Sequence, residues 1–410
     1  MQAKLETRLK TFWRSDKEPL TLWLIWRILL FLLPVAALLI LPGLPAILNP
    51  YIKVVWVDHT FGTWVRWDGI WYLQIAGQGY ASDQLAAFYP LYPFLVRAVA
   101  APFTFNNPSY EVLSIAGVLV SSLAALAAFV FLYRLALMDY DRKTARLSLL
   151  YLSAFPMAFF LFAVYTESLF LALAAGAFFA ARHNRWFLAL VLAALAVLTK
   201  NQGIVLVGAL LVEFIWQLRG KPVRFDRRLL YFGLPALVFG DWLALNALIY
   251  GTPFKFLQVN QTYWKHRFMW PWEAAGTAFD HFLHPTDGST GTTTWQSADQ
   301  IQGNLRFLDY PLTLAFVILL IVAIWATWKG YLRLSYLIFF AGCLVLPLTS
   351  PIEDFPLLSM PRYMLIIFPA FFLLAQAGKR WPVVHYLYLF FSLPLLIFLS
   401  VSFTLWYWIA

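Results

Sequence analysis

The sequence predicts an all-α polytopic membrane protein, and three observations support that prediction. Of the 410 residues, 62% are hydrophobic and only 12% are charged, whereas soluble domains carry about 25% charged residues. Long apolar runs recur along the chain, and about 20 apolar residues are enough for one membrane-spanning helix. The basic residues lie in short segments between those runs, a pattern typical of membrane topology rather than of a nucleic-acid-binding face. We therefore expect a single domain, 1–410, whose solvent is the lipid bilayer.

The N-terminal segment, 1–19, is basic and partly amphipathic, and it lacks a short apolar core with a small-residue cleavage site. We expect a cytoplasmic arm that lies on the membrane, not a secretory signal. About eleven spans follow, and the shorter ones would pack inside the bundle. The predicted spans are 20–41, 113–137, 147–165, 168–181, 186–198, 203–216, 229–249, 310–328, 334–348, 363–377 and 383–409.

Charge distribution sets the expected orientation. When the spans alternate from a cytoplasmic N-terminus, twenty of the 30 Lys and Arg residues fall on the N-terminal side and nine on the other, with Arg27 inside the first span. The positive-inside rule supports this arrangement, which places the C-terminus outside. Two long loops, 42–111 and 251–309, are then external. Prolines break the apolar stretch 86–103, so interfacial or re-entrant helices are expected in the first of these loops.

The first external loop contains the sequence "RWDGIWYLQIAGQGY" at 66–80. If 67–78 is helical, Trp67 and Trp71 share a face, and Asp68 and Tyr72 lie on its flank. The tryptophans suit the headgroup boundary. Asp68 would then be held at the bilayer surface, partly desolvated, where a carboxylate can serve as a general base. The alternative is that Asp68 caps a short interfacial helix or pairs with Arg66.

Other ionisable residues on the predicted outer side are also site candidates, because ionisable groups at membrane depth are costly. Glu167 lies in "VYTESLF", where it either contributes to a site or caps the next helix. Lys200 lies in "LTKNQGI" and either binds an anion or extends its amine to the interface.

Two further basic sequences offer a similar choice between membrane anchoring and phosphate binding. They are Lys265, His266 and Arg267 in "YWKHRFMWPWE", and Arg362 with Tyr363 in "SMPRYM". Asp58, His59, Glu353 and Asp354 are the remaining notable polar residues of these loops. The sequence contains no convincing metal-binding motif and no glycine-rich phosphate loop, so no metal or cofactor is expected. A transferase with an outward-facing site would need a lipid-linked donor.

Several sequence blocks together resemble the GPI mannosyltransferase 2 (PIG-V type) family and its bacterial relatives. The blocks occur in order over most of the chain as "RWDGIWYLQIAGQGY", "AFYPLYPFLVR", "YTESLFLALAAGAFFAARHNRW", "GTPFKFLQVNQTYW" and "SMPRYMLIIFPAFFLLA". The resemblance implies a GT-C type glycosyltransferase that takes a sugar, in this family mannose, from a polyprenyl-phosphate donor. The resemblance also implies that the catalytic carboxylate of the family is an aspartate in the first external loop.

The family motifs match particular residues of this chain. The Trp-Asp motif falls on Trp67 and Asp68, the acidic residue of the second motif on Glu167, and "PRY" on Pro361, Arg362 and Tyr363. Lys200 stands where a Thr-Arg-Pro-like turn is expected, and the proline of that turn is missing. The resemblance also implies an integral protein of the bacterial plasma membrane, or of the endoplasmic reticulum in a eukaryote.

The reaction that the resemblance implies is inverting transfer to a hydroxyl of a glycolipid or another acceptor. Asp68 would deprotonate that hydroxyl, and cations would stabilise the departing phosphate. The predicted catalytic residues are Asp68 and Glu167. Predicted substrate-binding residues are Arg66, Trp67, Trp71, Tyr72, Lys200, Lys265, His266, Arg267, Arg362 and Tyr363. The alternative is a lipid-linked sugar transporter or flippase, which should carry ionisable groups near the bilayer midplane and symmetric halves. Asp241 is the main acidic residue well inside a predicted span.

Overall fold

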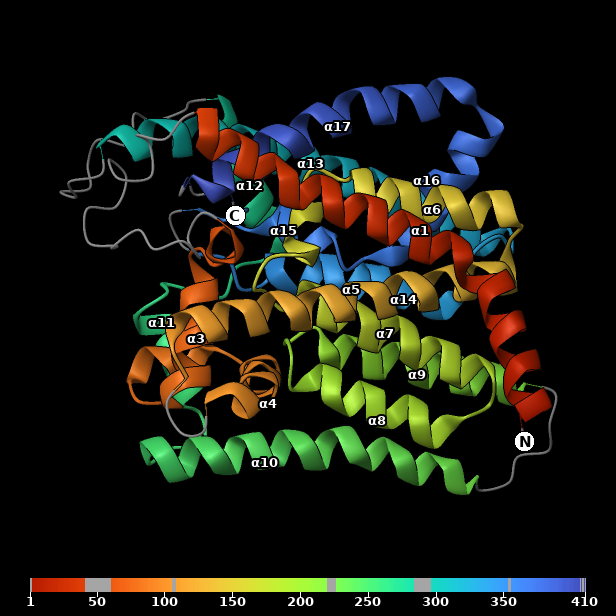
Figure 1. The fold of residues 1–410 in the computed structure, drawn as a ribbon, viewed down its shortest axis with the longest axis horizontal. Helices are drawn as coiled ribbons and strands as arrows, with labels where there is room; N and C mark the ends of the chain where they lie inside the picture. The colour runs from red at the N-terminus through yellow and green to blue at the C-terminus, as the bar shows by residue number, and fades with distance from the viewer. Residues whose placement is uncertain are drawn as a thin grey trace.

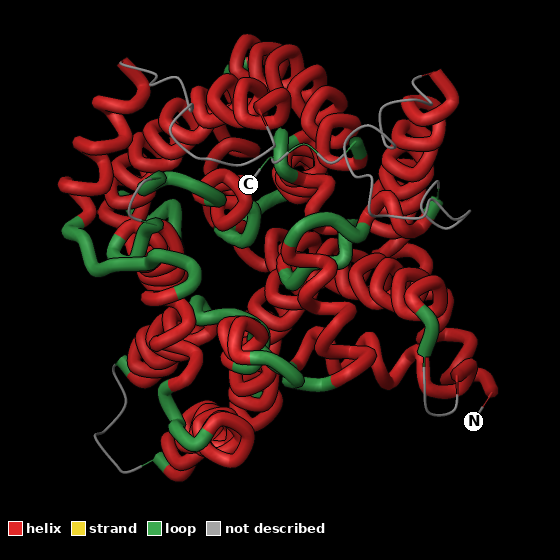
Figure 2. The backbone as a smooth tube through the Cα atoms, turned by 90° about the vertical axis from the view of Figure 1, so that its left-hand side faces the viewer, coloured by secondary structure: helices red, strands yellow, loops and turns green. Residues whose placement is uncertain are grey.

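A computed structural model describes residues 2–40, 60–104, 108–219, 226–283, 296–352, 355–405, 407 and 409. In this part of the chain the regular structure is helical, and extended pairing is limited to isolated bridges that join His266, Ile352 and Phe355. Figure 1 shows the long helices side by side along one direction, and Figure 2 shows many of them nearly end-on. The all-α polytopic fold predicted from sequence is therefore confirmed.

The structure gives the following elements in chain order. They are α1 (Gln2–Ile40), η2 (Phe61–Trp64), α3 (Asp68–Gln78), η3 (Asp83–Ala87), α4 (Leu91–Thr104), α5 (Tyr110–Asp139), α6 (Arg142–Ala154), η4 (Ala158–Leu161), α7 (Glu167–Arg182), α8 (Trp186–Val197), α9 (Gly203–Leu218), η5 (Arg227–Phe232), α10 (Gly233–Tyr250), α11 (Lys255–Thr262), α12 (Pro271–Leu283), α13 (Gln296–Trp328), α14 (Leu334–Leu348), α15 (Met360–Met364), α16 (Phe368–Arg380) and α17 (Pro382–Thr404).

Among the described residues, 5 helical segments are long and apolar enough to cross a membrane. They are Lys17–Ala37, Tyr110–Asp139, Arg227–Tyr250, Leu308–Trp328 and Pro382–Thr404. Shorter apolar helices lie at Leu91–Thr104, Trp186–Val197, Gly203–Leu218 and Leu334–Leu348. The total of about eleven spans stays a prediction.

Two predicted spans are not continuous helices. The predicted span 147–165 contains the end of α6 at Ala154, after which the chain follows an irregular course with the short helix η4. The predicted span 363–377 is divided between α15 and α16, with a break at 365–367. Both breaks are fully buried. Irregular backbone is tolerated at membrane depth where protein surrounds it, which composition alone does not reveal.

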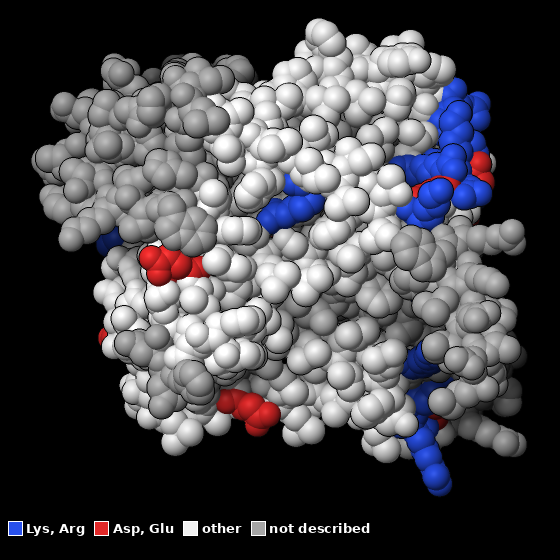
Figure 3. Space-filling model, viewed as in Figure 1, with Lys and Arg blue, Asp and Glu red and all other residues white. Residues whose placement is uncertain are grey.

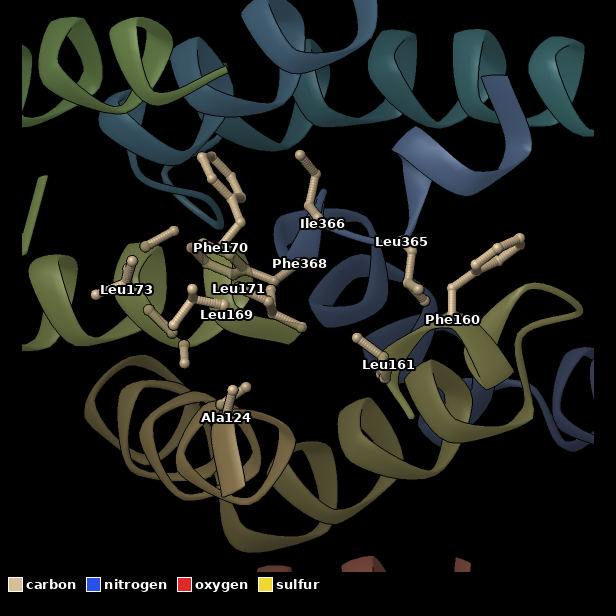
Figure 4. Close-up of a cluster of buried hydrophobic side chains, with 14 of the residues drawn as sticks. Ala124, Phe160, Leu161, Leu169, Phe170, Leu171, Leu173, Leu365, Ile366 and Phe368 are labelled. Carbon is tan, nitrogen blue, oxygen red and sulfur yellow. The ribbon is translucent and has the colours of Figure 1, made fainter. Parts of the chain in front are cut away.

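The two broken segments meet in the core. Figure 4 shows Leu365 near Phe160 and Leu161, with Ile366 and Phe368 near the start of α7. All of these side chains belong to the main buried hydrophobic cluster. Close packing of large side chains accounts for the burial of the irregular backbone, and it fixes the positions of the residues that flank each break.

Three other boundaries differ from the prediction. Residues 2–19 of the predicted arm are helical and continuous with the first predicted span, because α1 runs from Gln2 to Ile40. Helix α13 begins at Gln296, inside the predicted loop 251–309, and α17 ends at Thr404 instead of continuing to 409. Parts of both predicted loops lie outside the described residues. These parts are 42–59 and 105–107 for the first loop, and 284–295 for the second.

The predicted helices of the first external loop are present as α3 and α4. Helix α4 buries Tyr92, Val96 and Ala100, which are spaced four residues apart and therefore share one face. The Leu91 amide donates to the Leu198 carbonyl at 3.0 Å, so the start of α4 is attached to the turn that carries Lys200. The loop is thus part of the packed fold.

A group of charges, which we call the inner cluster, joins four helices at the end predicted to be cytoplasmic, and Glu213 is its one buried member. The cluster consists of Asp139, Arg182, Glu213 and Arg333. Arg182 contacts Asp139 at 2.7 Å, and Arg333 contacts Asp139 at 3.1 Å and Glu213 at 3.3 Å. Figure 3 shows Lys and Arg gathered at this end of the visible face, beside a largely uncharged surface. The side of the membrane on which this end lies stays a prediction.

Candidate active site

Asp68 is the first residue of α3, and the backbone before it has an unusual conformation. Trp67 has a φ of 52°, a left-handed value that is rare for a bulky residue and that clusters at functional sites. The Trp67 indole donates to the Tyr407 carbonyl at 3.2 Å. A Cβ atom on Gly69 would lie 3.2 Å from the Val164 carbonyl oxygen, so glycine permits close approach of α3 to the irregular segment before α7. These contacts fix the position of the Asp68 carboxylate.

Arg66 is 2% exposed, and its guanidinium donates to backbone carbonyls. The acceptors are Gly62 at 2.5 Å, Val65 at 3.0 Å and Thr404 at 3.1 and 3.2 Å. The carbonyl of Arg66 accepts a hydrogen bond from the Tyr165 hydroxyl at 3.1 Å. Arg66 therefore ties the first external loop to the end of α17. The role of Arg66 in substrate binding stays a prediction. Arg66 does not pair with Asp68, the alternative considered from sequence, because Asp68 pairs with a different arginine.

The arginine that pairs with Asp68 is Arg362, which lies 294 residues further along the chain. Nη1 of Arg362 contacts Oδ2 of Asp68 at 2.8 Å, and Nε lies 3.5 Å from Oε1 of Glu167. Arg362 is 6% exposed. Its guanidinium carbon lies 5.2 to 5.6 Å from the ring centres of three aromatic residues, Phe160, Tyr165 and Tyr363. The cation is thus enclosed by aromatic faces and aimed at both candidate acids.

Glu167 begins α7 and pairs with Lys200 at 2.6 Å between Oε1 and Nζ. Glu167 is 1% exposed and Lys200 is 8% exposed. Lys200 lies in the turn between α8 and α9, where a Cβ atom on Gly203 would come within 2.5 Å of the Val197 backbone. Because Lys200 is buried against a carboxylate, the alternative in which it extends to the interface is wrong. Glu167 does more than cap its helix, since it holds two cations.

Asp68, Arg362, Glu167 and Lys200 thus form an alternating row of charges, which we call the outer cluster. Two buried atoms of this cluster, Oε2 of Glu167 and Nε of Arg362, have no hydrogen-bond partner. Buried polar atoms are normally satisfied, so these two offer a donor and an acceptor to a polar ligand. The four residues come from α3, α15, α7 and the turn before α9, and the site forms only when those elements pack together.

Aromatic residues make up one side of this site. The ring of Tyr72 is buried and packs edge-on against Tyr92 and Tyr165, at centroid distances of 5.2 and 6.4 Å. Trp71 is partly exposed and lies 6.4 Å from the ring of Trp264. Tyr363 lies 4.9 Å below the Lys200 amine. The predicted aromatic contacts are therefore placed around the outer cluster, although their binding roles stay predictions.

Lys265, His266 and Arg267 lie beside the site without joining the row of charges. The Arg267 amide donates to Pro351 at 3.1 Å, and the His266 ring contacts the Ser350 carbonyl at 2.6 Å. The side chains of Lys265 and Arg267 are exposed. Burial lowers the pKa of His266, so the imidazole is largely uncharged at neutral pH. No described contact connects the two exposed cations to Asp68 or Glu167, and their phosphate-binding role stays a prediction.

Sequence reasoning missed two features of the site. One is the attachment of Arg66 to the end of α17, and the other is the aromatic enclosure of Arg362. The aromatic run "FFLFAVY" before Glu167 was a signal for the enclosure, because it is richer in rings than spanning a bilayer requires. Asp58, His59, Glu353 and Asp354 lie outside the described residues. Among the described side chains, no group of three or more His, Cys, Asp or Glu could hold a metal ion.

The fold and the site define a polytopic helical membrane protein with a buried, partly unsatisfied charge cluster at one end. A family model described as Mannosyltransferase (PIG-V) matches residues 15–225, which is about half of the chain and includes Asp68, Glu167 and Lys200. The chain therefore belongs to the PIG-V mannosyltransferase family. No curated protein matches the chain.

Solved structures similar to this chain include the oligosaccharyltransferase of Archaeoglobus fulgidus. Its apo form is 12% identical, with 96% of this chain and 56% of that chain covered and a TM-score of 0.45. The oligosaccharyltransferase AglB from the same organism, in complex with an inhibitory peptide and a dolichol-phosphate, is 11% identical, with 97% and 55% covered and a TM-score of 0.42. The chain thus spans little more than half the length of these proteins.

Proposed function

We propose that this protein transfers a hexose, specifically mannose, from a polyprenyl- or dolichyl-phosphate donor to a hydroxyl group of a glycolipid or another acceptor. The outer cluster is the observation that supports this proposal, in a chain that belongs to a mannosyltransferase family. The cluster combines a carboxylate suited to proton removal with two cations suited to phosphate. In our proposal the reaction takes place on the extracytoplasmic side of a bacterial plasma membrane.

Arg362 and Lys200 are the proposed phosphate ligands. Both are nearly buried, and both contact the same oxygen of Glu167, so Glu167 holds the two cations close to one another. A phosphate with several anionic oxygens can engage the planar guanidinium and the compact ammonium together. Fixed cations in a water-poor site also stabilise the negative charge that develops on a departing phosphate. Glu167 thus acts in our proposal as a positioning residue.

Asp68 is the proposed general base, and its exposure distinguishes it from Glu167. The Asp68 side chain is 25% exposed, whereas that of Glu167 is 1% exposed. A general base must come within about 3 Å of the proton that it removes, and only an accessible carboxylate can meet an acceptor from outside the fold. The left-handed conformation of Trp67 supports the same assignment, because it directs the start of α3 to the cluster.

The contact between Asp68 and Arg362 suggests an order of events. Before substrate binds, Arg362 neutralises the base at 2.8 Å. In our proposal the donor phosphate draws the guanidinium away and leaves Asp68 free to accept a proton. The acceptor oxygen then attacks the anomeric carbon while its proton passes to Asp68. The bond between that carbon and the phosphate oxygen breaks, and the bonding electron pair leaves with the lipid phosphate. A single displacement of this kind inverts the anomeric centre.

The remaining predicted contacts take secondary roles in this proposal. Trp71 and Tyr363 are partly exposed and offer aromatic surface to the sugar or the lipid, next to the buried ring of Tyr72. Arg66 and Trp67 position the loop that carries Asp68. The exposed Lys265 and Arg267, with His266 between them, offer positive charge to the lipid headgroup as it approaches.

The decisive experiment measures mannose transfer from polyprenyl-phosphate mannose by the full chain in vesicles that contain acceptor lipids. We expect Asp68→Asn to lower turnover by about 10²- to 10⁴-fold, the usual contribution of a general base. Asp83→Asn is the matched control, because Asp83 is exposed and pairs with Lys255 away from the cluster. This control should retain wild-type activity.

Equal turnover of the Asp68 and Asp83 variants would overturn the assignment of the base. Movement of the mannolipid across the vesicle membrane without any transfer would support the flippase alternative and contradict the proposed reaction. Product with retained anomeric configuration would contradict the single displacement.

A further inference from the structure

Helix α10 carries an ionisable residue that the proposed reaction does not use. With η5 it forms the candidate span Arg227–Tyr250, of which the most apolar window is only 17% buried. Figure 1 shows α10 at the lower edge of the bundle, and Figure 2 also places helices at that edge. Asp241 is exposed on this helix. It lies nine residues before Tyr250, or about 13 Å along a helix that rises 1.5 Å per residue.

The carboxylate of Asp241 has no hydrogen bond or ion pair with any described residue. The acids of the inner and outer clusters are different, since Asp68, Glu167, Asp139 and Glu213 each contact a cation. Ionisable side chains within membrane spans are rare, and they normally face the bundle interior or pair with another polar group. An unpaired acid on a helix that faces lipid therefore indicates that something else covers it.

A row of small residues runs beside Asp241, which itself lies between the exposed Leu237 and Leu248. Ala236, Gly240 and Ala244 are exposed on the same face at intervals of four residues. A Cβ atom added to Gly240 would meet nothing within 4 Å. Small residues at this spacing let two membrane helices approach closely, and polar side chains then join across the contact. The Asp241 carboxylate can then bind a polar group of the partner helix, and the small residues determine how closely the two helices approach.

We propose that this face of α10 binds a membrane-spanning helix of a partner protein, which carries a lysine or arginine that pairs with Asp241. Charge complementarity identifies the partner's chemistry. A symmetric contact with a second copy through α10 would place two Asp241 carboxylates together. Arg27, the cation inside the α1 span, is already engaged with the Phe162 carbonyl at 3.4 Å and with two aromatic rings. The proposal goes beyond the transferase reaction and does not depend on it.

The test uses the full chain in vesicles and a labelled leucine-rich spanning peptide with one central lysine. Its control peptide has leucine at that position. Energy transfer between peptide and protein should show that the lysine peptide binds about three- to thirtyfold more tightly, the range expected for one polar contact between membrane helices. Asp241→Leu should abolish that preference, and Asp241→Lys should transfer it to a peptide with a central aspartate.

Gly240→Leu keeps the Asp241 carboxylate and fills the open space beside it. It should therefore weaken the binding of both peptides by the same factor and leave the ratio of their affinities unchanged. Helical content and mannose transfer should be normal in all three variants, since α10 lies outside the proposed site. The same lysine preference in the wild type and in Asp241→Leu would overturn the proposal. Efficient disulfide dimers of Gly240→Cys in membranes would also overturn it in favour of a second copy, because Cys343, the only native cysteine, is buried.

Discussion

The two charge clusters contain the same kinds of groups but differ in how completely they are hydrogen-bonded. In the inner cluster all four carboxylate oxygens of Asp139 and Glu213 have partners, including the hydroxyls of Ser335 and Tyr336. In the outer cluster one oxygen of Glu167 and one nitrogen of Arg362 have no hydrogen-bond partner, although that nitrogen lies 3.5 Å from the other oxygen of Glu167. A closed set of pairs holds helices together, whereas an open set retains binding capacity.

The surroundings of the clusters differ in a matching way. Each charged residue of the inner cluster lies at or near the end of a regular helix of at least 15 residues, so the contacts join α5, α7, α9 and α14 directly. The outer cluster instead relies on short or irregular elements, including the five-residue α15. Binding sites need such backbone because it can aim several side chains at one point. The comparison leads to different expectations for matched substitutions at the two ends.

The largest effect is expected from Arg182→Ala in the inner cluster. Without Arg182, Asp139 and Glu213 share a single cation, Arg333. Breaking a buried ion pair costs about 3–5 kcal/mol of folding free energy. Arg182 is 8% exposed at its side chain, so solvent cannot replace the lost contact. Denaturant unfolding in detergent measures the loss, and Arg185→Ala, an exposed cation in the same loop, is the control. Correctly folded Arg182→Ala protein should retain its turnover, and a stable but inactive variant would break the distinction between the clusters.

Arg362→Ala should show the opposite pattern. We expect about a 10²- to 10³-fold loss of transfer, equivalent to about 2.7–4 kcal/mol of transition-state stabilisation. The structural cost should be smaller than for Arg182, because Glu167 keeps Lys200 and Asp68 is partly exposed. Arg362→Lys keeps the charge and loses the planar fork, so it should recover part of the donor affinity. Turnover measured at varied donor concentration gives both the transfer rate and the donor affinity. A wild-type donor affinity in Arg362→Ala would contradict the role of Arg362 as a phosphate ligand.

Much of the fold could be predicted from sequence, and so could the individual residues of the site, but not the contacts between them. Apolar runs indicated the helices, and the cost of charge at membrane depth singled out Asp68, Glu167, Lys200 and Arg362 individually. Their pairing could not be predicted, because the contacts join residues up to 294 positions apart. The choice between capping and pairing at Glu167 depended on whether Lys200 turned inward. That orientation is set by tertiary packing around a tight turn.

The broken spans were missed for a related reason. Hydropathy reports how apolar a segment is, and the segments around Pro156 and Ile366 are as apolar as a span. What distinguishes them is that protein surrounds their backbone, which only the packed structure shows. The same limit applies to Arg66. Its neighbours in sequence suggested Asp68 or substrate as a partner, but its main acceptor is the Thr404 carbonyl 338 residues away.

A substitution of Arg66 tests whether the role of a buried cation follows from its hydrogen bonds or from its position near the site. Arg66 lies at the outer end, but its guanidinium makes four hydrogen bonds to carbonyls, as in a closed structural contact. Arg66→Ala should cost about 1–3 kcal/mol of stability, since buried carbonyls lose their donors. Turnover should fall because Asp68 is no longer held in place, while donor affinity should match the wild type. Unfolding and donor-dependent kinetics on the same preparation separate these effects. A rise in the donor KM with unchanged stability would instead place Arg66 among the substrate ligands, as the family motif implies.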